Sequence, residues 1–263
     1  YDVGWKAMAT NLSDIAAMGG VPLYALINAG LPSDMYVDDV KDLYRGMLSI
    51  SDKYSVKIIG GDLVRSEVSF ITIVIIGKSD KNLLLRSEMA AGDVIAVTGN
   101  LGSSAAGLRI LSGDFSSRAE AYKSIIESHL RPCPRIKEGM ILANNGIRAA
   151  MDISDGLLVD LHKLCDSSAV GAMIYANKIP ISQDLQNVFS SDEIIALALS
   201  GGEDYELLFS GPEDTVLSTI PELPAGATII GKVSESNVGK VYLLDLEDKP
   251  IALDYMGWDH FKL

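Results

Sequence analysis

Cysteine, histidine and long apolar runs are scarce in this sequence of 263 residues. It has two cysteines, Cys133 and Cys165, and three histidines. The cysteines form no CxxC pair and have no zinc-type spacing with histidine, which argues against a structural zinc ion and against a fold that depends on disulfides. We therefore expect a protein that works in a reducing compartment, the cytoplasm.

No apolar run approaches the roughly 20 residues that a membrane-spanning helix needs. Basic residues are also in the minority, because 22 lysines and arginines stand against 35 acids and the formal net charge is −13. This charge argues against nucleic acid or an anionic membrane surface as a partner. Phosphorylated ligands stay possible, because a divalent cation held by carboxylates can bridge two negative groups.

Helical and strand patterns alternate along the chain, and 48% of the residues are hydrophobic, enough for a sizeable core. This order predicts two α/β (or α+β) domains, residues 1–85 and 86–263. We expect helices at residues 8–18, 34–50, 103–111, 122–130, 136–144, 157–165 and 194–199. We expect strands at residues 23–29, 56–59, 68–77, 93–98, 149–153, 171–175, 206–209, 227–233 and 241–244.

Common phosphate-binding and catalytic motifs are weak or missing. Gly77-Lys78-Ser79 ends like a Walker A loop, but Thr72 stands where that motif needs glycine. Gly99 and Gly102 make half of a dinucleotide fingerprint, for which a tight turn is the commoner explanation. HExxH, GxSxG and the kinase HRD set do not occur in the sequence.

Two carboxylates in the first third of the chain are candidate ligands. Asp14 follows Asn11 by three residues, so both lie on the helix face opposite Leu12. Asp62 follows two glycines, and we expect it at the end of the predicted strand 56–59, where glycine allows close approach of a ligand. A solvated helix face and a simple turn explain these two acids equally well.

The segment 151–161, MDISDGLLVDL, places acids between a predicted strand and a predicted helix. Asp152 and Ser154 are two residues apart, which predicts that they share one face of the strand. Asp155 is expected at the N-terminus of the helix, where a simple helix cap explains it as well as a role at an anion-binding site does. A carboxylate in an apolar strand is costly unless it is paired or binds a metal. Asp160, further along the helix, is expected to be an ordinary solvated acid.

Gly201-Gly202-Glu203-Asp204 repeats the pattern of glycines followed by acids beside an apolar strand. Oxygen ligands without histidine or cysteine select magnesium, manganese or calcium over zinc. Carboxylates, magnesium and phosphate together are typical of phosphoryl transfer. The residues alone therefore predict a magnesium–phosphate site where strands end, as ligands in α/β proteins commonly bind there.

Six segments, in order, resemble motifs of the thiamine-monophosphate kinase family, within the superfamily typified by aminoimidazole ribonucleotide synthetase. They are NLSDIAAMGGVP, GGDLVR, LLLRSEMAAGD, MDISDGLLVDL, LSGGEDYELLF and MGWDHF. The resemblance implies the two-domain aminoimidazole ribonucleotide synthetase-like fold. It also implies ATP-dependent phosphorylation of thiamine monophosphate to thiamine diphosphate, by direct in-line transfer with several magnesium ions and no catalytic side-chain nucleophile.

The resemblance also implies a role for individual residues. Four acids are expected to bind metal: Asp14, Asp62, Asp152 and Asp155. Five residues are expected to bind ATP: Tyr44, Gly61, Asp62, Arg86 and Ser154. Two residues are expected to bind thiamine monophosphate: Glu203 and Trp258. The Trp258 ring would lie against the cationic thiazolium.

Family members carry a further segment before the position of Tyr1, with additional metal ligands and a substrate-side histidine. We therefore expect an N-terminal domain that lacks its first segment, and a homodimer formed through this domain. Two alternatives stay open. One is another ATP-dependent enzyme of the superfamily, such as the synthetase or a hydrogenase-maturation dehydratase. The other is a non-catalytic homologue that binds nucleotide or metal.

Overall fold

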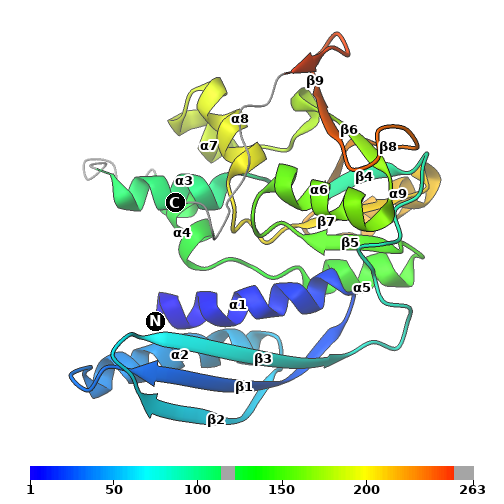
Figure 1. Cartoon of the computed structure of the whole chain (residues 1–263). Coiled ribbons are helices and arrows are strands. Elements are labelled where there is room, and N and C mark those ends of the chain that lie inside the picture. The colour runs from blue at the N-terminus through cyan, green and yellow to red at the C-terminus, as the bar shows by residue number, and fades with distance from the viewer. Residues whose placement is uncertain (114–121, 252–263) are drawn as a thin grey trace.

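The structure is a computed structural model that describes residues 1–113 and 122–251 of the chain (Figure 1). It contains a three-stranded sheet with the strand order β2-β1-β3 and a seven-stranded sheet with the order β10-β9-β6-β8-β4-β7-β5. Helices and strands of both sheets agree with the predicted α/β (or α+β) fold class. Trp258 lies outside the described residues.

The first sheet is built from the first third of the chain. β1 pairs with β2 in parallel and with β3 in antiparallel orientation. Helix α1 lies between this sheet and the rest of the molecule (Figure 1). The elements are α1 (Asp2–Ala17), β1 (Val21–Leu31), α2 (Val37–Lys53), β2 (Lys57–Arg65) and β3 (Phe70–Lys78).

Helix α1 begins earlier in the chain than the apolar periodicity predicts. Its first turns pack against α2 through two glycines. A Cβ atom on Gly4 would lie 1.9 Å from the carbonyl oxygen of Leu43, and one on Gly46 would lie 2.0 Å from that of Tyr1. Because backbone atoms make this contact, the apolar pattern of the sequence does not predict that the helix includes these first residues.

Strand β2 continues through Gly60-Gly61-Asp62, so the predicted strand end before these residues is wrong. Gly61 pairs with Ile27 and Asp62 with Asn28. A Cβ atom on Gly61 would lie 1.7 Å from the carbonyl oxygen of Ile27, and its φ is +146°. The glycine therefore serves close backbone approach between two strands.

The second sheet is largely antiparallel, with one parallel pair between β6 and β9. Two of its helices, α7 and α9, are short and were not predicted. The strands are β4 (Val94–Thr98), β5 (Ala149–Asp152), β6 (Gly171–Tyr175), β7 (Leu207–Gly211), β8 (Ala227–Ser234), β9 (Val241–Leu244) and β10 (Pro250–Ile251). The helices are α3 (Ser103–Ser112), α4 (Lys123–Leu130), α5 (Ile136–Asn144), α6 (Leu157–Ser168), α7 (Gln183–Val188), α8 (Ser191–Ser200) and α9 (Glu213–Thr219).

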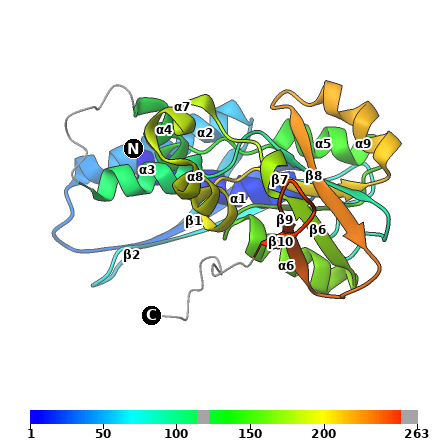
Figure 2. The ribbon, with the colours of Figure 1, turned by 90° about the horizontal axis from the view of Figure 1, so that it is seen from above.

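One hydrophobic core joins the two parts of the chain. It contains Leu12 and Met47 from the first part together with Leu142 and Phe209 from the second. Helices α1 and α5 touch closely, because a Cβ atom on Gly139 would lie 2.0 Å from the carbonyl oxygen of Ala16. Figure 2 shows α1 beneath the elements of the second part. This packing places side chains of α1 beside the ends of β5 and β7.

Candidate functional site

Two loops meet where β5 ends and β7 begins. The β5–β7 pairing continues past the strands, because Ile153 N–H donates to the Glu206 carbonyl at 2.8 Å and Tyr205 N–H donates to the Ile153 carbonyl at 2.9 Å. Glu203 N–H then donates to the Ser154 carbonyl at 2.8 Å. The loop of Ser154, which is predicted to bind ATP, and the loop of Glu203, which is predicted to bind thiamine monophosphate, are therefore joined by backbone hydrogen bonds.

Glycine allows this close contact between the loops. A Cβ atom on Gly202 would lie 2.6 Å from the Ser154 carbonyl oxygen. One on Gly156, where φ is +114°, would lie 3.0 Å from the Ser200 carbonyl oxygen. The glycines of the SDG and GGED segments thus bring two acidic loops together, a role that the sequence pattern did not indicate.

Asp152 is buried at the end of β5, with 3% of its surface exposed. The Ser13 hydroxyl of α1 donates to its Oδ2 at 2.7 Å. The pKa of Asp152 is raised to about 6, first by burial and then by the charges of Asp14 and Asp160, while the Ser13 hydrogen bond opposes the change. Burying this carboxylate is therefore costly, as the sequence predicts, and among the described residues Ser13 is the side chain that offsets the cost.

Asp14 lies in the last turns of α1 and Arg86 in the connection that follows β3, and both side chains face solvent. Partial burial raises the pKa of the Asp14 carboxyl, and the charge of Arg86 lowers it. The predicted metal ligand and the predicted phosphate-binding arginine are therefore close enough to interact. An arginine beside carboxylates is suited to a triphosphate that carries its own cations.

The side chain of Asp155 does not cap α6, which begins at Leu157 after Gly156. The predicted N-cap is thus wrong, because Asp155 turns toward Lys163 and forms an ion pair at 2.5 Å. Ser154 lies beyond the end of β5, although its carbonyl still takes part in the pairing with the loop of Glu203. The strand ends one residue earlier than the apolar pattern predicts.

Asp160 is fully buried, so the prediction of a solvated acid is wrong. Its Oδ2 accepts the N–H groups of Ser154 at 3.0 Å and Asp155 at 2.9 Å, and its Oδ1 pairs with Lys163 at 2.8 Å. Burial raises the pKa of this carboxyl, and the Lys163 hydrogen bond opposes the change. Asp160 holds the loop that carries the predicted ligands, a role that helical periodicity alone does not indicate.

Glu203 follows α8 and has a left-handed backbone, with φ of +68°. Its Oε2 accepts a hydrogen bond from Lys6 Nζ of α1 at 2.9 Å. A non-glycine residue in this region is strained and persists only where its surroundings hold it, as at many ligand sites. Lys6 was not singled out by the sequence, because a lone lysine on a helix has no distinguishing pattern.

Tyr205 is buried at the junction of the two loops, and the pKa of its phenol responds to the acids near it. Burial raises the pKa of its phenol, and four carboxylates raise it further: Glu203, Asp152, Asp14 and Asp155. Three of the four predicted metal ligands and the predicted substrate-binding glutamate are therefore near enough to act electrostatically on one side chain. Lys6 pairs with Glu203 and Lys163 with Asp155, so the charge that a divalent cation would offset is chiefly that of Asp152 and Asp14.

The remaining predicted residues lie on the first sheet and its helix. Asp62 and Gly61 are exposed on β2, and Tyr44 is half-buried on α2 against the core. Among the residues that the structure describes, no three His, Cys, Asp or Glu side chains are grouped closely enough to hold a metal ion. A cation at these acids would therefore take its other ligands from phosphate oxygens and water.

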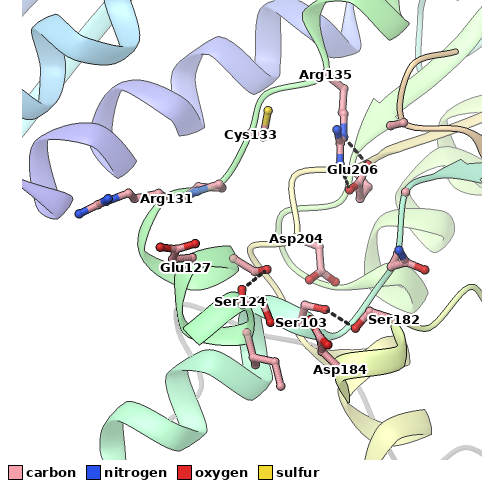
Figure 3. A pocket seen from close by; sticks show the side chains of 16 residues that line it. Ser103, Ser124, Glu127, Arg131, Cys133, Arg135, Ser182, Asp184, Asp204 and Glu206 are labelled. Carbon is pink, nitrogen blue, oxygen red and sulfur yellow. Dashed lines mark hydrogen bonds and ion pairs between the residues drawn. The ribbon is translucent and has the colours of Figure 1, made fainter. Parts of the chain in front are cut away.

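A cavity of about 440 Å³ lies beside the substrate loop, between α3, α4 and α7 (Figure 3). Asp204 lines it and accepts the N–H groups of Gly102 at 2.7 Å and Ser104 at 3.1 Å at the start of α3. Burial raises the pKa of Asp204 to about 7. In the same wall, Arg135 Nε donates to Glu206 Oε2 at 2.7 Å. These pairs fix the second half of GGEDYE in place.

In the described ranges 1–113 and 122–251, no helix has the length and apolar character to cross a membrane. Both cysteines are free, and Cys133 is exposed whereas Cys165 is buried.

Known protein families match both parts of the chain. Residues 1–79 match the N-terminal domain of AIR synthase related proteins, and residues 90–244 match their C-terminal domain. A thiamine-monophosphate kinase of Buchnera aphidicola subsp. Schizaphis graminum is 38% identical over 265 residues, covering 99% of this chain and 80% of the relative. That of Bacillus subtilis is 35% identical over 268 residues, covering 99% and 82%.

Solved structures agree with these matches. A structure described as AaThiL complexed with AMPPCP and TMP superposes with a TM-score of 0.88 at 34% identity, covering 99% of this chain and 80% of that one. Thiamine monophosphate kinase from Aquifex aeolicus gives 0.84 at 33% identity, covering 95% and 81%. A hydrogenase maturation protein, HypE, in complex with ATP gives 0.78 at 18% identity, covering 96% and 79%, which shows a shared fold alone.

Proposed function

Because the chain belongs to the thiamine-monophosphate kinase family of AIR synthase related proteins, we propose that it phosphorylates thiamine monophosphate to thiamine diphosphate with ATP. The observation that carries this proposal in the structure is the hydrogen-bonded junction of the acidic loop 152–155 with the loop of Glu203, against which α1 places Ser13 and Lys6. The sequence motifs and the relatives support the same reaction. The two-domain fold predicted from the resemblance is confirmed by the family matches and the solved structures.

Magnesium is a cation that these oxygen donors suit. Asp14, Asp152 and Asp155 would each contribute ligands to magnesium ions whose other ligands are phosphate oxygens and water, and the charge of Asp14 already raises the pKa of Asp152. Bound there with ATP, magnesium supplies charge neutralisation and alignment of phosphate oxygens. Lys163, paired with Asp155, holds that carboxylate in place until a ligand competes for it.

The protein's own residues would mainly bind and orient the two substrates. Arg86 would contact the ATP phosphates beside Asp14, and the Ser154 loop would contact the nucleotide. Glu203 would bind thiamine monophosphate at the junction of the two loops. With both substrates held there, the acceptor phosphate oxygen can attack the γ-phosphorus in line, and no side-chain nucleophile is required.

Four predicted residues keep the roles implied by the resemblance as proposals. Asp62 would bind metal and ATP, Gly61 and Tyr44 would contact ATP, and Trp258 would stack on the thiazolium. Replacing Trp258 by alanine is then expected to raise the KM for thiamine monophosphate more than the KM for ATP. Steady-state kinetics with each substrate varied in turn tests this, and equal changes in both constants would contradict the stacking role.

We also propose a homodimer formed through the first sheet. The face of this sheet that α1 and α2 leave uncovered exposes Tyr24, Phe70, Val74 and Ile76 (Figure 1). A contiguous apolar face of this kind is typical of an interaction site.

The free thiols support the cytoplasm as the proposed compartment.

The decisive experiment incubates the protein with ATP, magnesium and thiamine monophosphate and measures thiamine diphosphate by chromatography. We expect product with the wild type and none with Asp152→Asn. ATP binding without any product from the wild type would reject the kinase and favour a non-catalytic homologue. Product that forms equally well with Asp152→Asn would reject the proposed role of Asp152.

A further inference from the structure

Lys6 joins three segments that are distant in the sequence. Its Nζ lies 2.9 Å from Glu203 Oε2 and 3.3 Å from both ring nitrogens of His129 on α4. His129 Nδ1 lies 3.6 Å from the same glutamate oxygen and 3.2 Å from the Ser104 hydroxyl of α3. A basic side chain from the first part of the chain therefore meets an imidazole and a carboxylate from the second.

The side chains of this cluster become more exposed from His129 through Lys6 to Glu203. The side chain of His129 is 11% exposed and that of Lys6 is 19% exposed, whereas that of Glu203 is 39% exposed. Burial and the charge of Lys6 lower the pKa of His129, which favours the neutral imidazole. A neutral ring can accept a hydrogen from the Lys6 ammonium group and help to direct that group toward Glu203.

Glu203 is held at its backbone and at one of its two carboxylate oxygens. Its N–H is bonded to the Ser154 carbonyl at 2.8 Å, its φ is +68°, and its Oε2 is bonded to Lys6. Its Oε1 has no hydrogen-bond partner within the described part of the chain. One oxygen is thus fixed by the protein, and the other is left for a ligand.

We propose that Lys6, supported by His129, is a positioning residue that orients Glu203 for binding of the thiamine phosphate substrate. The inference rests on the proposed function, since it concerns the substrate of that reaction. Lys6 acts through Glu203 and belongs to α1, so it makes substrate binding depend on the contact between the two parts of the chain. The ligand class is a phosphate ester that carries a cationic thiazolium ring and an aminopyrimidine.

The test compares three variants with the wild type. Lys6→Met removes the ammonium group and keeps the length of the side chain, whereas Lys6→Arg restores the positive charge. Lys41→Met is the control, because Lys41 forms an exposed ion pair with Asp38 on α2. Steady-state kinetics are measured with thiamine monophosphate varied at saturating ATP and the reverse, and thermal denaturation checks that each variant is folded.

Lys6→Met is expected to raise the KM for thiamine monophosphate by about tenfold, because a hydrogen bond between charged groups is lost. The KM for ATP should stay within about twofold, and Lys6→Arg should recover most of the loss. Lys41→Met should change neither constant. If Lys6→Met raises both KM values equally, or lowers only kcat, the positioning role is overturned.

A double-mutant cycle gives a second test, because it compares the loss of substrate binding in the double variant with the losses in the two single variants. Glu203→Gln alone should weaken substrate binding, and adding Lys6→Met should cost little more, because both variants break the same contact. Additive losses would overturn the inference while leaving the proposed reaction intact. A wild type that forms no thiamine diphosphate would overturn both, so the two failures are distinguishable.

Discussion

At the scale of single residues, acids that look alike in the sequence differ strongly in the structure. Asp152 and Asp160 are both buried, whereas Asp14 faces solvent. Asp160 has three partners for its carboxylate, and Asp152 has one from Ser13. A buried carboxylate with few partners is what a cation can stabilise, whereas a fully paired one is structural. We therefore propose a ligand role for Asp152, whereas the contacts of Asp160 support the loop.

The ionised form of Asp152 should destabilise the metal-free protein. Since its pKa is raised to about 6 from 3.8, the folded state binds this proton more tightly than the unfolded state. Stability from this group is present below pH 4 and lost as the pH rises to about 6, by about 3 kcal/mol. Asp152→Asn lacks the charge, so its free energy of unfolding should fall less between pH 5 and pH 7.5.

Urea denaturation without divalent ions measures this difference. Magnesium and ATP should make the free energy of unfolding of the wild type fall less with rising pH, and they should have little effect on the pH dependence of Asp152→Asn. A parallel pH dependence in the two proteins would show that another group is responsible.

Asp160→Ala should lower the free energy of unfolding by about 3 kcal/mol, because it leaves two buried N–H groups and a lysine without their partner. It should also weaken ATP binding, since the loop of Ser154 and Asp155 loses its support. Asp166→Ala is the matched control, because Asp166 is exposed on the same helix. Calorimetric titration and urea denaturation test both effects, and equal losses in the two variants would argue against this assignment.

At the scale of elements, β2 shows how a local motif depends on its neighbour. The GGD segment has the composition of a turn, and it was predicted to follow a strand. The β1 backbone lies so close to Gly61 that the segment pairs as a strand instead. Turn propensity is a weak preference that pairing with an adjacent strand can override.

Gly61→Ala should therefore destabilise the first part of the chain by more than about 3 kcal/mol, because its Cβ would overlap the Ile27 carbonyl oxygen. Gly60→Ala provides the control one residue away, where the nearest atom would be Leu26 Cδ2 at 3.5 Å. That variant should stay within about 1 kcal/mol of the wild type. Chemical denaturation of both proteins decides the point, and similar losses would mean that general loss of backbone freedom, not the contact, matters at Gly61.

At the scale of the whole molecule, the two sheets share one core but differ in how they are covered. Core side chains from both parts pack around α1 and α5, so the site at the loop junction depends on both. The outer face of the first sheet, in contrast, is open and apolar (Figure 1).

Val74→Asp on this face should convert a dimer into a monomer, because a buried unpaired charge would be placed in the proposed interface. Val74 is 47% exposed, and Leu217 on α9 is 52% exposed, so Leu217→Asp is a control of similar exposure away from the sheet. Light scattering after size exclusion measures the mass of each. A wild type that is monomeric at all concentrations, or a Val74→Asp variant that stays dimeric, would reject the proposed interface.

The sequence by itself determined the chemistry: acids beside glycines, the order of helices and strands, and motifs specific enough to indicate the family. These features are local, because periodicity and short motifs depend on neighbouring residues. Only the tertiary structure decided that Asp152 and Asp160 are buried, that β2 runs through Gly61, and that Lys6 reaches Glu203. Those outcomes depend on burial and on contacts between residues up to 197 positions apart, which no local pattern encodes.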